Sequence, residues 1–319
     1  MPGCPACKKT EAKEIIKINS YSIFKCSNCG LIFTNPLPED KDLDEYYQGF
    51  LFNEPKPDKI KKQIESRTNE LNAHFIPKSD DLSQISFLDY GGGTGAMFEA
   101  ARKTGYDAFY FDIDKESVGF VKNNFGLSED EQIKDLSLKG RTFDYIWSDN
   151  VIEHVKDPSL FIKTLYDSLN PDGKLIIKTP QASNTETCFV FALSMLSYFK
   201  RAVKENSLMK SLASVLRYRF WHCEPPRHLY AFSKKSILEI AESLDIDKSR
   251  IKMSDYYMSM FLYSLPYTFF KMPNTLFKYV FGLAIIPFII PEFFVILLRV
   301  LLSKLGLISG TGLIIKIIK

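Results

Sequence analysis

A glycine-rich turn between a short apolar stretch and a helical stretch constrains the fold of this 319-residue chain more than any other feature. Residues 85–90 are predicted to form a buried strand, and the turn at residues 91–95 leads into a helix over residues 96–103. A strand, a glycine-rich turn and a helix begin many nucleotide-binding parallel sheets, because glycines let a ligand lie against bare main chain. The sequence therefore predicts an α/β domain with a ligand site at this turn.

The detail of the turn narrows the choice of ligand. A second strand is expected over residues 107–112, and it ends in Asp112, about 20 residues beyond the glycines, where an acid accepts from ribose hydroxyls. The turn reads Asp89-x-Gly91-x-Gly93-x-Gly95, which is neither G-x-G-x-x-G nor a P-loop. Asp89 would repel a pyrophosphate but favours a cationic ligand, such as the amino group and sulfonium of S-adenosylmethionine.

These residues resemble the first motif of class I S-adenosylmethionine-dependent methyltransferases. Residues 143–150 resemble the fourth strand of that family, and residues 151–155 (Val-Ile-Glu-His-Val) are similar to its L-E-H-V segment. Residues 226–233 resemble a later segment in which a His-containing turn precedes a helix. The resemblance covers residues 85–180 and resumes at 226–257 and 310–318. It implies a Rossmann-like seven-stranded sheet with helices on both faces, with a short third strand near residues 132–138 and a last strand at 310–318.

The resemblance also implies the cofactor contacts. Those on the methionine and ribose side would be Asp89, Gly91, Gly93 and Gly95. Asp112 would hold the ribose hydroxyls and Asp135 the adenine. Asp149 or Asn150, at the carboxyl end of the fourth strand, would lie beside the sulfonium.

Methyl transfer to a hydroxyl needs a general base. His154 is the first choice, because it follows the fourth strand, and His228 is the second. Glu153 is expected to orient or tune a histidine. Two other interpretations stay open: His154 caps or packs the following helix, and His228 is an ordinary turn residue.

Two C-x-x-C pairs, Cys4/Cys7 and Cys26/Cys29, stand 18 residues apart. Four thiolates form a closed tetrahedral zinc site, so we predict a structural zinc ribbon over residues 1–40 with a hairpin between the pairs. A pair of redox dithiols is the alternative. The chain starts Met-Pro-Gly-Cys without a basic and apolar leader, so we expect a reducing, cytoplasmic compartment. A zinc ribbon, a connector and this methyltransferase domain, in that order, resemble a subgroup that includes sugar methyltransferases.

The expected organisation is a ribbon at 1–40, connector helices at 41–82 and a methyltransferase domain at 83–319, with a polar helix over residues 57–82 in the connector. Helical insertions are predicted at 181–225 and 258–305. The whole chain has a net charge of +3, but residues 181–235 hold nine Lys/Arg and three Glu, and residues 259–319 hold six Lys/Arg and one Glu. Basic groups beside apolar stretches favour contact with anionic lipid at the inner face of the plasma membrane. A buried lid or a homodimer interface is the alternative.

The sequence thus predicts an enzyme that methylates a hydroxyl of a sugar or a lipid-linked glycan at a membrane surface. O-methylation of a polyprenylated quinone precursor is a second enzyme hypothesis. A zinc-ribbon RNA methyltransferase is a third, and the neutral ribbon and acidic remainder of the chain argue against nucleic acid. A non-catalytic membrane scaffold is the hypothesis from another class, and the intact glycine turn argues against it.

Overall fold

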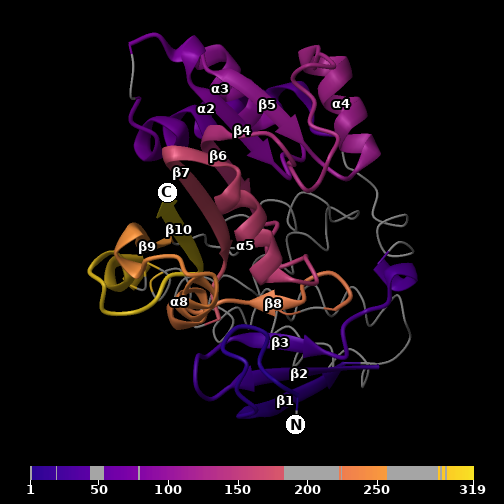
Figure 1. Cartoon of the computed structure of the whole chain (residues 1–319), viewed down its shortest axis with the longest axis vertical. Helices are drawn as coiled ribbons and strands as arrows, with labels where there is room; N and C mark the ends of the chain where they lie inside the picture. Colours follow the sequence, from indigo (N-terminus) through magenta and orange to yellow (C-terminus); the bar gives the residue numbers. More distant parts are fainter. Residues whose placement is uncertain are drawn as a thin grey trace, which may run out of the picture.

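The computed structural model describes most of the chain outside the two predicted insertions. The described residues are 2–18, 20–43, 54–77, 80–182, 223, 225–256, 294, 297–298 and 300–319. Both insertions lie almost wholly outside these residues. Among the described helices, none has the length and apolar character needed to cross a bilayer. A large sheet and a small one dominate the fold (Figure 1).

The large sheet has six strands in the order β5-β4-β6-β7-β10-β9. They are β4 (Ser86–Tyr90), β5 (Asp107–Phe111), β6 (Phe143–Asp149), β7 (Leu169–Pro180), β9 (Ile251–Tyr256) and β10 (Gly312–Ile318). The first four pair in parallel, and β10 is antiparallel to both of its neighbours. The predicted last strand therefore pairs inside the sheet, next to β7.

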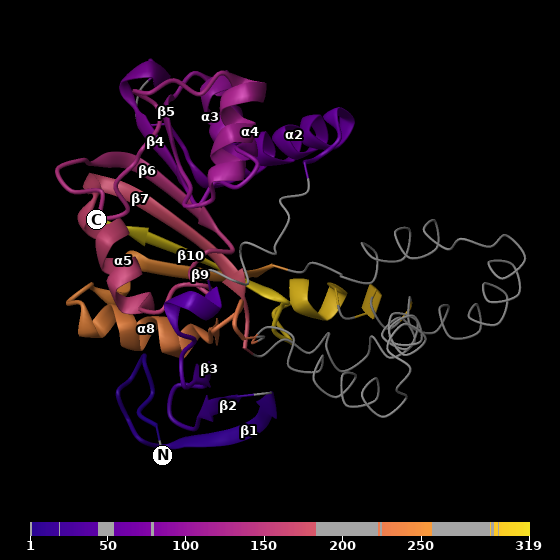
Figure 2. The same cartoon turned by 90° about the vertical axis from the view of Figure 1, so that its right-hand side faces the viewer.

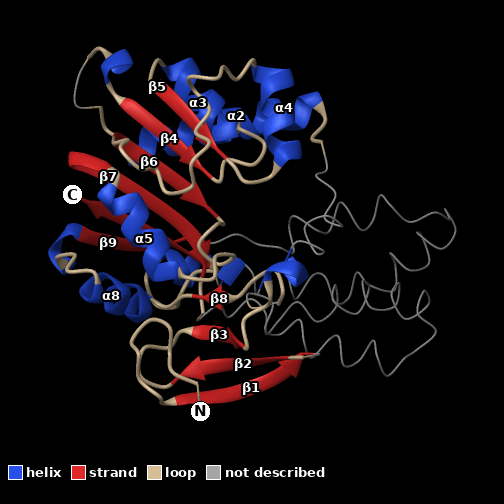
Figure 3. Ribbon diagram, turned by 45° about the vertical axis from the view of Figure 1, so that its right-hand side comes forward, coloured by secondary structure: helices blue, strands red, loops and turns tan. Residues whose placement is uncertain are grey.

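Helices cover both faces of this sheet (Figure 3). One face carries α2 (Pro57–His74), α3 (Ala96–Thr104) and α4 (Lys115–Phe125), and the other carries α5 (Pro158–Asp167) and α8 (Lys234–Ser243). Side chains alternate across a strand, so Phe87 packs toward the first set and Leu88 toward the second. Short 3-10 turns, η1 (Leu82–Gln84) and η3 (Lys248–Arg250), precede β4 and β9. The predicted Rossmann-like architecture is confirmed.

The predicted count of seven strands is wrong for the described residues, because no third strand forms near residues 132–138. A single parallel bridge joins Tyr110 to Gln132, and the Ile133 amide donates to the Tyr110 carbonyl at 2.9 Å. Beyond this point the Asp135 carboxylate accepts from the Ser137 amide at 2.9 Å. This local turn competes with a strand ladder, so the chain leaves the sheet edge after one bridge.

The connector helix is shorter than predicted. The expected helix over residues 57–82 ends at His74, and Phe75 is extended. Pro77 explains the early end, because proline disfavours the helical conformation of the residue before it. Leu71 and Phe75 are buried against the sheet, so this segment packs on the main core.

The small sheet contains the cysteine pairs and has the order β1-β2-β3-β8. Its strands are β1 (Ala12–Ile18), β2 (Tyr21–Cys26), β3 (Ile32–Asn35) and β8 (Tyr230–Ala231). The predicted hairpin between the cysteine pairs is present as β1 and β2. β8 comes from the distant segment that resembles the family's His-containing turn. Figure 2 shows this sheet beside α8, and one hydrophobic core continues from the cysteines into the large sheet.

Candidate cofactor and catalytic site

The glycine turn connects β4 to α3, and its glycines have different surroundings. A Cβ at Gly91 would lie 2.4 Å from a Val151 methyl group, and one at Gly95 would lie 2.6 Å from a Val121 methyl group. A Cβ at Gly93 would meet no atom within 4 Å. Gly91 and Gly95 therefore allow close packing inside the protein, whereas Gly93 borders open space where a ligand can approach the main chain.

Asp112 lies at the carboxyl end of β5 and faces the glycine turn. Its carboxylate accepts from the Gly93 amide at 2.7 Å and from the Asp114 amide at 2.8 Å. The Tyr110 hydroxyl donates to the Gly93 carbonyl at 2.7 Å, so the turn is fixed from both sides. Burial raises the pKa of Asp112 above its ordinary value. The predicted ribose-binding acid and the predicted glycine loop are thus in direct contact.

Asp89 lies beneath the turn and is 3% exposed. Its carboxylate accepts from the Phe98 amide at 3.0 Å, in the first turn of α3. Burial raises its pKa to about 7, although that amide acts in the opposite direction. The predicted acid therefore has a second use in this fold, because it satisfies an amide at the start of a helix.

Asp149 and Asn150 end β6, as predicted. Asp149 forms an ion pair with Arg67 of α2 at 2.7 Å, and Lys178 of β7 lies 3.8 Å away. Asn150 is exposed, has a positive φ of 57°, and donates its amide side chain to Asp149 at 2.9 Å. The Asp149 carboxylate is therefore held by basic side chains from a helix and a strand.

The basic partners of Asp149 were not predicted from the sequence. Arg67 and Lys178 both contact Glu70, at 2.5 and 2.6 Å, so charges of opposite sign alternate around a closed group of four residues. Lys178 also lies 4.9 Å from the centre of the Tyr256 ring. The spacing of Arg67, Glu70 and His74, which places them on one face of a helix, was the sequence pattern that could have indicated a polar contact of this helix.

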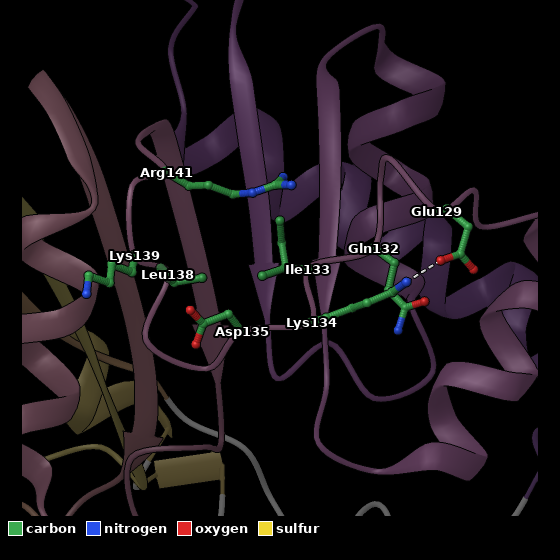
Figure 4. Close-up of a pocket in the computed structure, with 8 residues that line it drawn as sticks. All are labelled: Glu129, Gln132, Ile133, Lys134, Asp135, Leu138, Lys139 and Arg141. Carbon is green, nitrogen blue, oxygen red and sulfur yellow. Dashed lines mark hydrogen bonds and ion pairs between the residues drawn. The ribbon is translucent and has the colours of Figure 1, made fainter.

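Asp135 lies apart from the glycine turn. It is exposed, and it lines a pocket of about 300 Å³ together with residues from 129 to 141 (Figure 4). The pocket lies where the third strand was expected. Next to it, the Tyr90 hydroxyl donates to the Leu136 carbonyl at 3.1 Å, and the Tyr90 ring stacks on Phe111 at 4.6 Å. The predicted adenine-side acid is therefore in a pocket beside the ends of β4 and β5.

The three predicted catalytic residues lie together beyond the end of β6. One ligand atom from each of Glu153, His154 and His228 lies within 4.8 Å of the others, and the two imidazole rings are 4.7 Å apart. Glu153 is fully buried and accepts from the Thr179 hydroxyl at 3.0 Å. Burial raises its pKa to about 8. The topology thus brings residues 74 positions apart into one cluster.

Arg227 fixes both histidines. The His154 Nδ1 lies 3.1 Å from the Arg227 carbonyl, so Nδ1 carries the proton and Nε2 the lone pair. An Arg227 Nη2 atom donates to His228 Nε2 at 3.0 Å. Burial, with help from the Arg227 charge, lowers the pKa of His154 to about 4. A guanidinium this close disfavours a bound cation, so the cluster suits proton transfer better than metal binding.

The four predicted zinc ligands also converge. Sulfur atoms of Cys4 and Cys29 are 3.5 Å apart, those of Cys7 and Cys26 are 3.6 Å apart, and all four lie within 4.8 Å. Each pair lies on a tight turn, with the Lys8 amide bonded to the Cys4 carbonyl and the Gly30 amide to that of Cys26. Sulfurs in a tetrahedral zinc site are about 3.8 Å apart. The arrangement fits such a site with little adjustment.

Comparisons with known proteins agree with this geometry. The family described as "Methyltransferase domain" matches residues 59–247, more than half of the chain. A ubiquinone biosynthesis O-methyltransferase from Bartonella tribocorum is 25% identical over 171 residues, which are 52% of this chain and 64% of that protein. A second ubiquinone biosynthesis O-methyltransferase, from Parvibaculum lavamentivorans, is 33% identical over 115 residues, which are 34% of this chain and 44% of that protein. The matches thus span less than two thirds of either relative.

A solved structure of a SAM-dependent methyltransferase from Archaeoglobus fulgidus is also similar. The two chains are 12% identical, and the match covers 80% of this chain and 94% of the Archaeoglobus chain with a TM-score of 0.44. The family match spans the glycine turn, the four parallel strands β4 to β7 and the histidine cluster. This chain therefore belongs to the class I S-adenosylmethionine-dependent methyltransferases.

Proposed function

We propose that this protein transfers a methyl group from S-adenosylmethionine to the oxygen of a hydroxyl, and that the acceptor is a polyprenylated quinone precursor. The observation that carries the proposal is the half-buried, neutral His154 in its cluster with Glu153 and His228. The names of the two relatives support this choice of acceptor.

The residues of the glycine turn fit S-adenosylmethionine. Gly93 borders open space, Asp112 presents a carboxylate fixed by the Gly93 amide about 20 residues after the glycines, and no basic side chain appears among the predicted contacts. Asp89 and Asp149 are further acidic side chains near the turn, and the charge of Asp149 is balanced by Arg67 and Lys178. When bound, this cofactor supplies a methyl group that is already activated. The protein then has to align the acceptor, exclude water and remove one proton.

His154 is suited to remove that proton. Its pKa of about 4 keeps the imidazole neutral at physiological pH, and the bond from Nδ1 leaves the lone pair on Nε2. In the proposed step Nε2 takes the proton of the acceptor hydroxyl as its oxygen bonds to the methyl carbon and the methyl carbon–sulfur bond breaks, which leaves S-adenosylhomocysteine and a protonated His154. The Arg227 carbonyl and the His228 ring hold the His154 ring in place.

A sugar or lipid-linked glycan hydroxyl is the second candidate acceptor. It is favoured by the cysteine cluster, since a zinc ribbon before this domain resembles the subgroup that includes sugar methyltransferases. An RNA acceptor is less well supported, because the first 40 residues carry five Lys and four acidic groups and have no basic face to offer. A non-catalytic scaffold would not need the contact between Gly93 and Asp112.

The acceptor experiment compares three probes with one purified protein. Methyl-labelled S-adenosylmethionine is incubated with a short-chain polyprenyl catechol, with a lipid-linked glycan and with transfer RNA. Label in the catechol alone supports the proposal, and label in the glycan or the RNA alone replaces it. The His154→Gln variant is the matched control, which should bind the cofactor but transfer about a hundredfold more slowly. Absence of cofactor binding by the wild type would refute the whole proposal.

We also propose that Cys4, Cys7, Cys26 and Cys29 hold a structural zinc ion. The sulfur separations of 3.5 and 3.6 Å support it, and all four positions are filled by protein, which leaves none open for chemistry. Metal analysis should give about one zinc per chain. The Cys7→Ser/Cys26→Ser double variant should lose it.

The proposed location is the cytoplasmic face of a membrane. Helical residues near the end of the second predicted insertion expose apolar side chains at helical spacing, namely Phe294, Leu297, Leu298 and Leu301, followed by Leu305 and Leu307. The flanking chain is basic. Flotation with anionic liposomes tests this proposal: the wild type should float, and a Leu297→Ser/Leu301→Ser variant should float less. A wild type that stays at the bottom would favour a lid or a homodimer.

A further inference from the structure

The sheet of the cysteine ribbon continues into the segment that carries His228. β3 pairs with β8 through Phe33 opposite Tyr230 and Ile32 opposite Ala231. The Thr34 amide extends this pairing with a bond to the Leu229 carbonyl at 2.9 Å. The residue next to His228 is thus tied to the third strand of the ribbon.

The other side of the same segment is tied to the catalytic loop. The Leu229 amide donates to the Glu153 carbonyl at 2.8 Å, and the Tyr230 hydroxyl donates to the Lys156 carbonyl at 2.8 Å. Leu229 therefore uses its carbonyl toward the ribbon and its amide toward the loop that holds Glu153 and His154. One residue links the two parts of the molecule by main-chain bonds alone.

A second link starts from a cysteine turn. The Ser233 hydroxyl donates to the Cys29 carbonyl at 2.5 Å, and the Lys235 ammonium donates to the Asn28 carbonyl at 2.7 Å. Ser233 is also the N-cap of α8, where its hydroxyl oxygen accepts from the Ser236 amide at 3.0 Å. The turn of the second cysteine pair is therefore bonded to the end of the segment 229–233 at Ser233, and β3 is bonded to its start at Leu229.

The segment around β8 has little stability of its own. β8 contains only two residues, and so short a strand depends on the elements that pair and pack with it. Leu229, Tyr230 and Phe232 are fully buried in the core that also contains Cys4, Cys26 and Cys29. A change in the ribbon therefore alters the packing around His228 as well as its main-chain bonds.

We propose that the cysteine ribbon is a positioning element of the catalytic cluster, and that metal binding by its four cysteines holds the segment 227–229 against His154. The cofactor turn follows β4, and no main-chain hydrogen bond among the described residues joins it to the ribbon. Metal loss should thus disturb the acceptor side of the site and spare cofactor binding. The inference rests on the proposed catalytic role of His154. Its test measures amide exchange and the pKa of His154, so it does not depend on the identity of the acceptor.

The test uses two variants of one residue in the full-length, metal-loaded protein. Thr34→Pro removes the amide that bonds to Leu229, whereas Thr34→Val keeps that amide and removes only the hydroxyl near Cys223. In Thr34→Pro the Leu229 amide should exchange with deuterium at least about tenfold faster. The pKa of His154, followed by NMR of its ring protons, should rise above about 4, because water reaches the ring when the segment loosens and Arg227 moves away. Thr34→Val should change neither.

Metal removal from the wild type gives an independent reading if Thr34→Pro fails to fold. Chelation should increase exchange in the ribbon and in residues 227–233 together, while residues 86–112 stay protected and bind S-adenosylmethionine with the same affinity within about twofold. Exchange confined to the ribbon would overturn the proposal. Exchange throughout the chain would also overturn it, because the ribbon would then be a general stabilising element. Failure of methyl transfer with these results intact would refute only the proposed function.

Discussion

The Gly93 amide donates to the Asp112 carboxylate at 2.7 Å, so the glycine turn after β4 and the acid after β5 form one unit. A carboxylate fixed in this way can accept from a ligand's hydroxyls without losing further conformational entropy. This contact links the two sequence signals that pointed to a nucleoside-containing cofactor.

Asp112→Asn should weaken S-adenosylmethionine binding by about tenfold or more, because an amide replaces one charged acceptor with a donor. Isothermal titration calorimetry measures the effect. Asp107→Asn, at the exposed start of the same strand, is the control and should bind normally. Equal affinities for the wild type and Asp112→Asn would remove Asp112 from the cofactor site.

Gly93→Ala should mainly weaken cofactor binding, whereas Gly95→Ala should mainly lower thermal stability. Both positions have positive φ, of 51° and 70°, so each alanine costs about 1 kcal/mol of backbone strain. The Gly95 variant also places its Cβ against Val121 and should lower Tm further, while the Gly93 variant should mainly lower cofactor affinity. Thermal unfolding and calorimetry on both proteins decide the assignment. Equal affinity losses would contradict it.

Glu153 should make the protein less stable as pH rises. Its folded pKa of about 8 lies above its ordinary value of 4.5, so between these pH values the folded state binds more protons than the unfolded state. The free energy of unfolding should therefore fall with increasing pH, by at most about 1.4 kcal/mol per pH unit from this group. Urea unfolding between pH 5.5 and pH 8, roughly the window between those two pKa values, measures the slope. Glu153→Gln keeps an acceptor for Thr179 and should reduce the slope of the free energy of unfolding against pH. An unchanged slope would mean that Asp89, not Glu153, causes the pH dependence.

The ion pair between Arg67 and Asp149 should fix α2 to the sheet. Their side chains are 30% and 11% exposed, whereas the control pair Lys163 and Asp167 is more than half exposed on the surface of α5. A double-mutant cycle with Arg67→Met and Asp149→Asn should give a coupling of about 1–3 kcal/mol, against at most about 0.5 for the control pair. Equal couplings in the two cycles would show that the pair adds nothing beyond a surface contact.

Local signals in the sequence determined part of the sheet. The strands at 86–90 and 107–111 and the hairpin between the cysteine pairs follow from short patterns, and the structure confirms them. The strands at 143–149 and 312–318 were implied by the family resemblance and are also present. The third strand that the same resemblance implied does not form among the described residues, because the side chain of Asp135 satisfies the backbone locally.

The sequence by itself determined which chemistry this protein can contain: a glycine turn with an acid after the next strand, four cysteines at zinc-ligand spacing, and histidines after the fourth strand. Only the tertiary structure decided that Arg67 and Lys178 surround Asp149, that Arg227 holds both histidines, and that β3 of the ribbon supports His228. The physical reason is range. Strands and turns depend on neighbours a few residues away. In contrast, the contacts of Arg67 with Asp149, of Arg227 with His154 and of β3 with β8 join residues from about 70 to nearly 200 positions apart, which meet only when the sheets are assembled and packed.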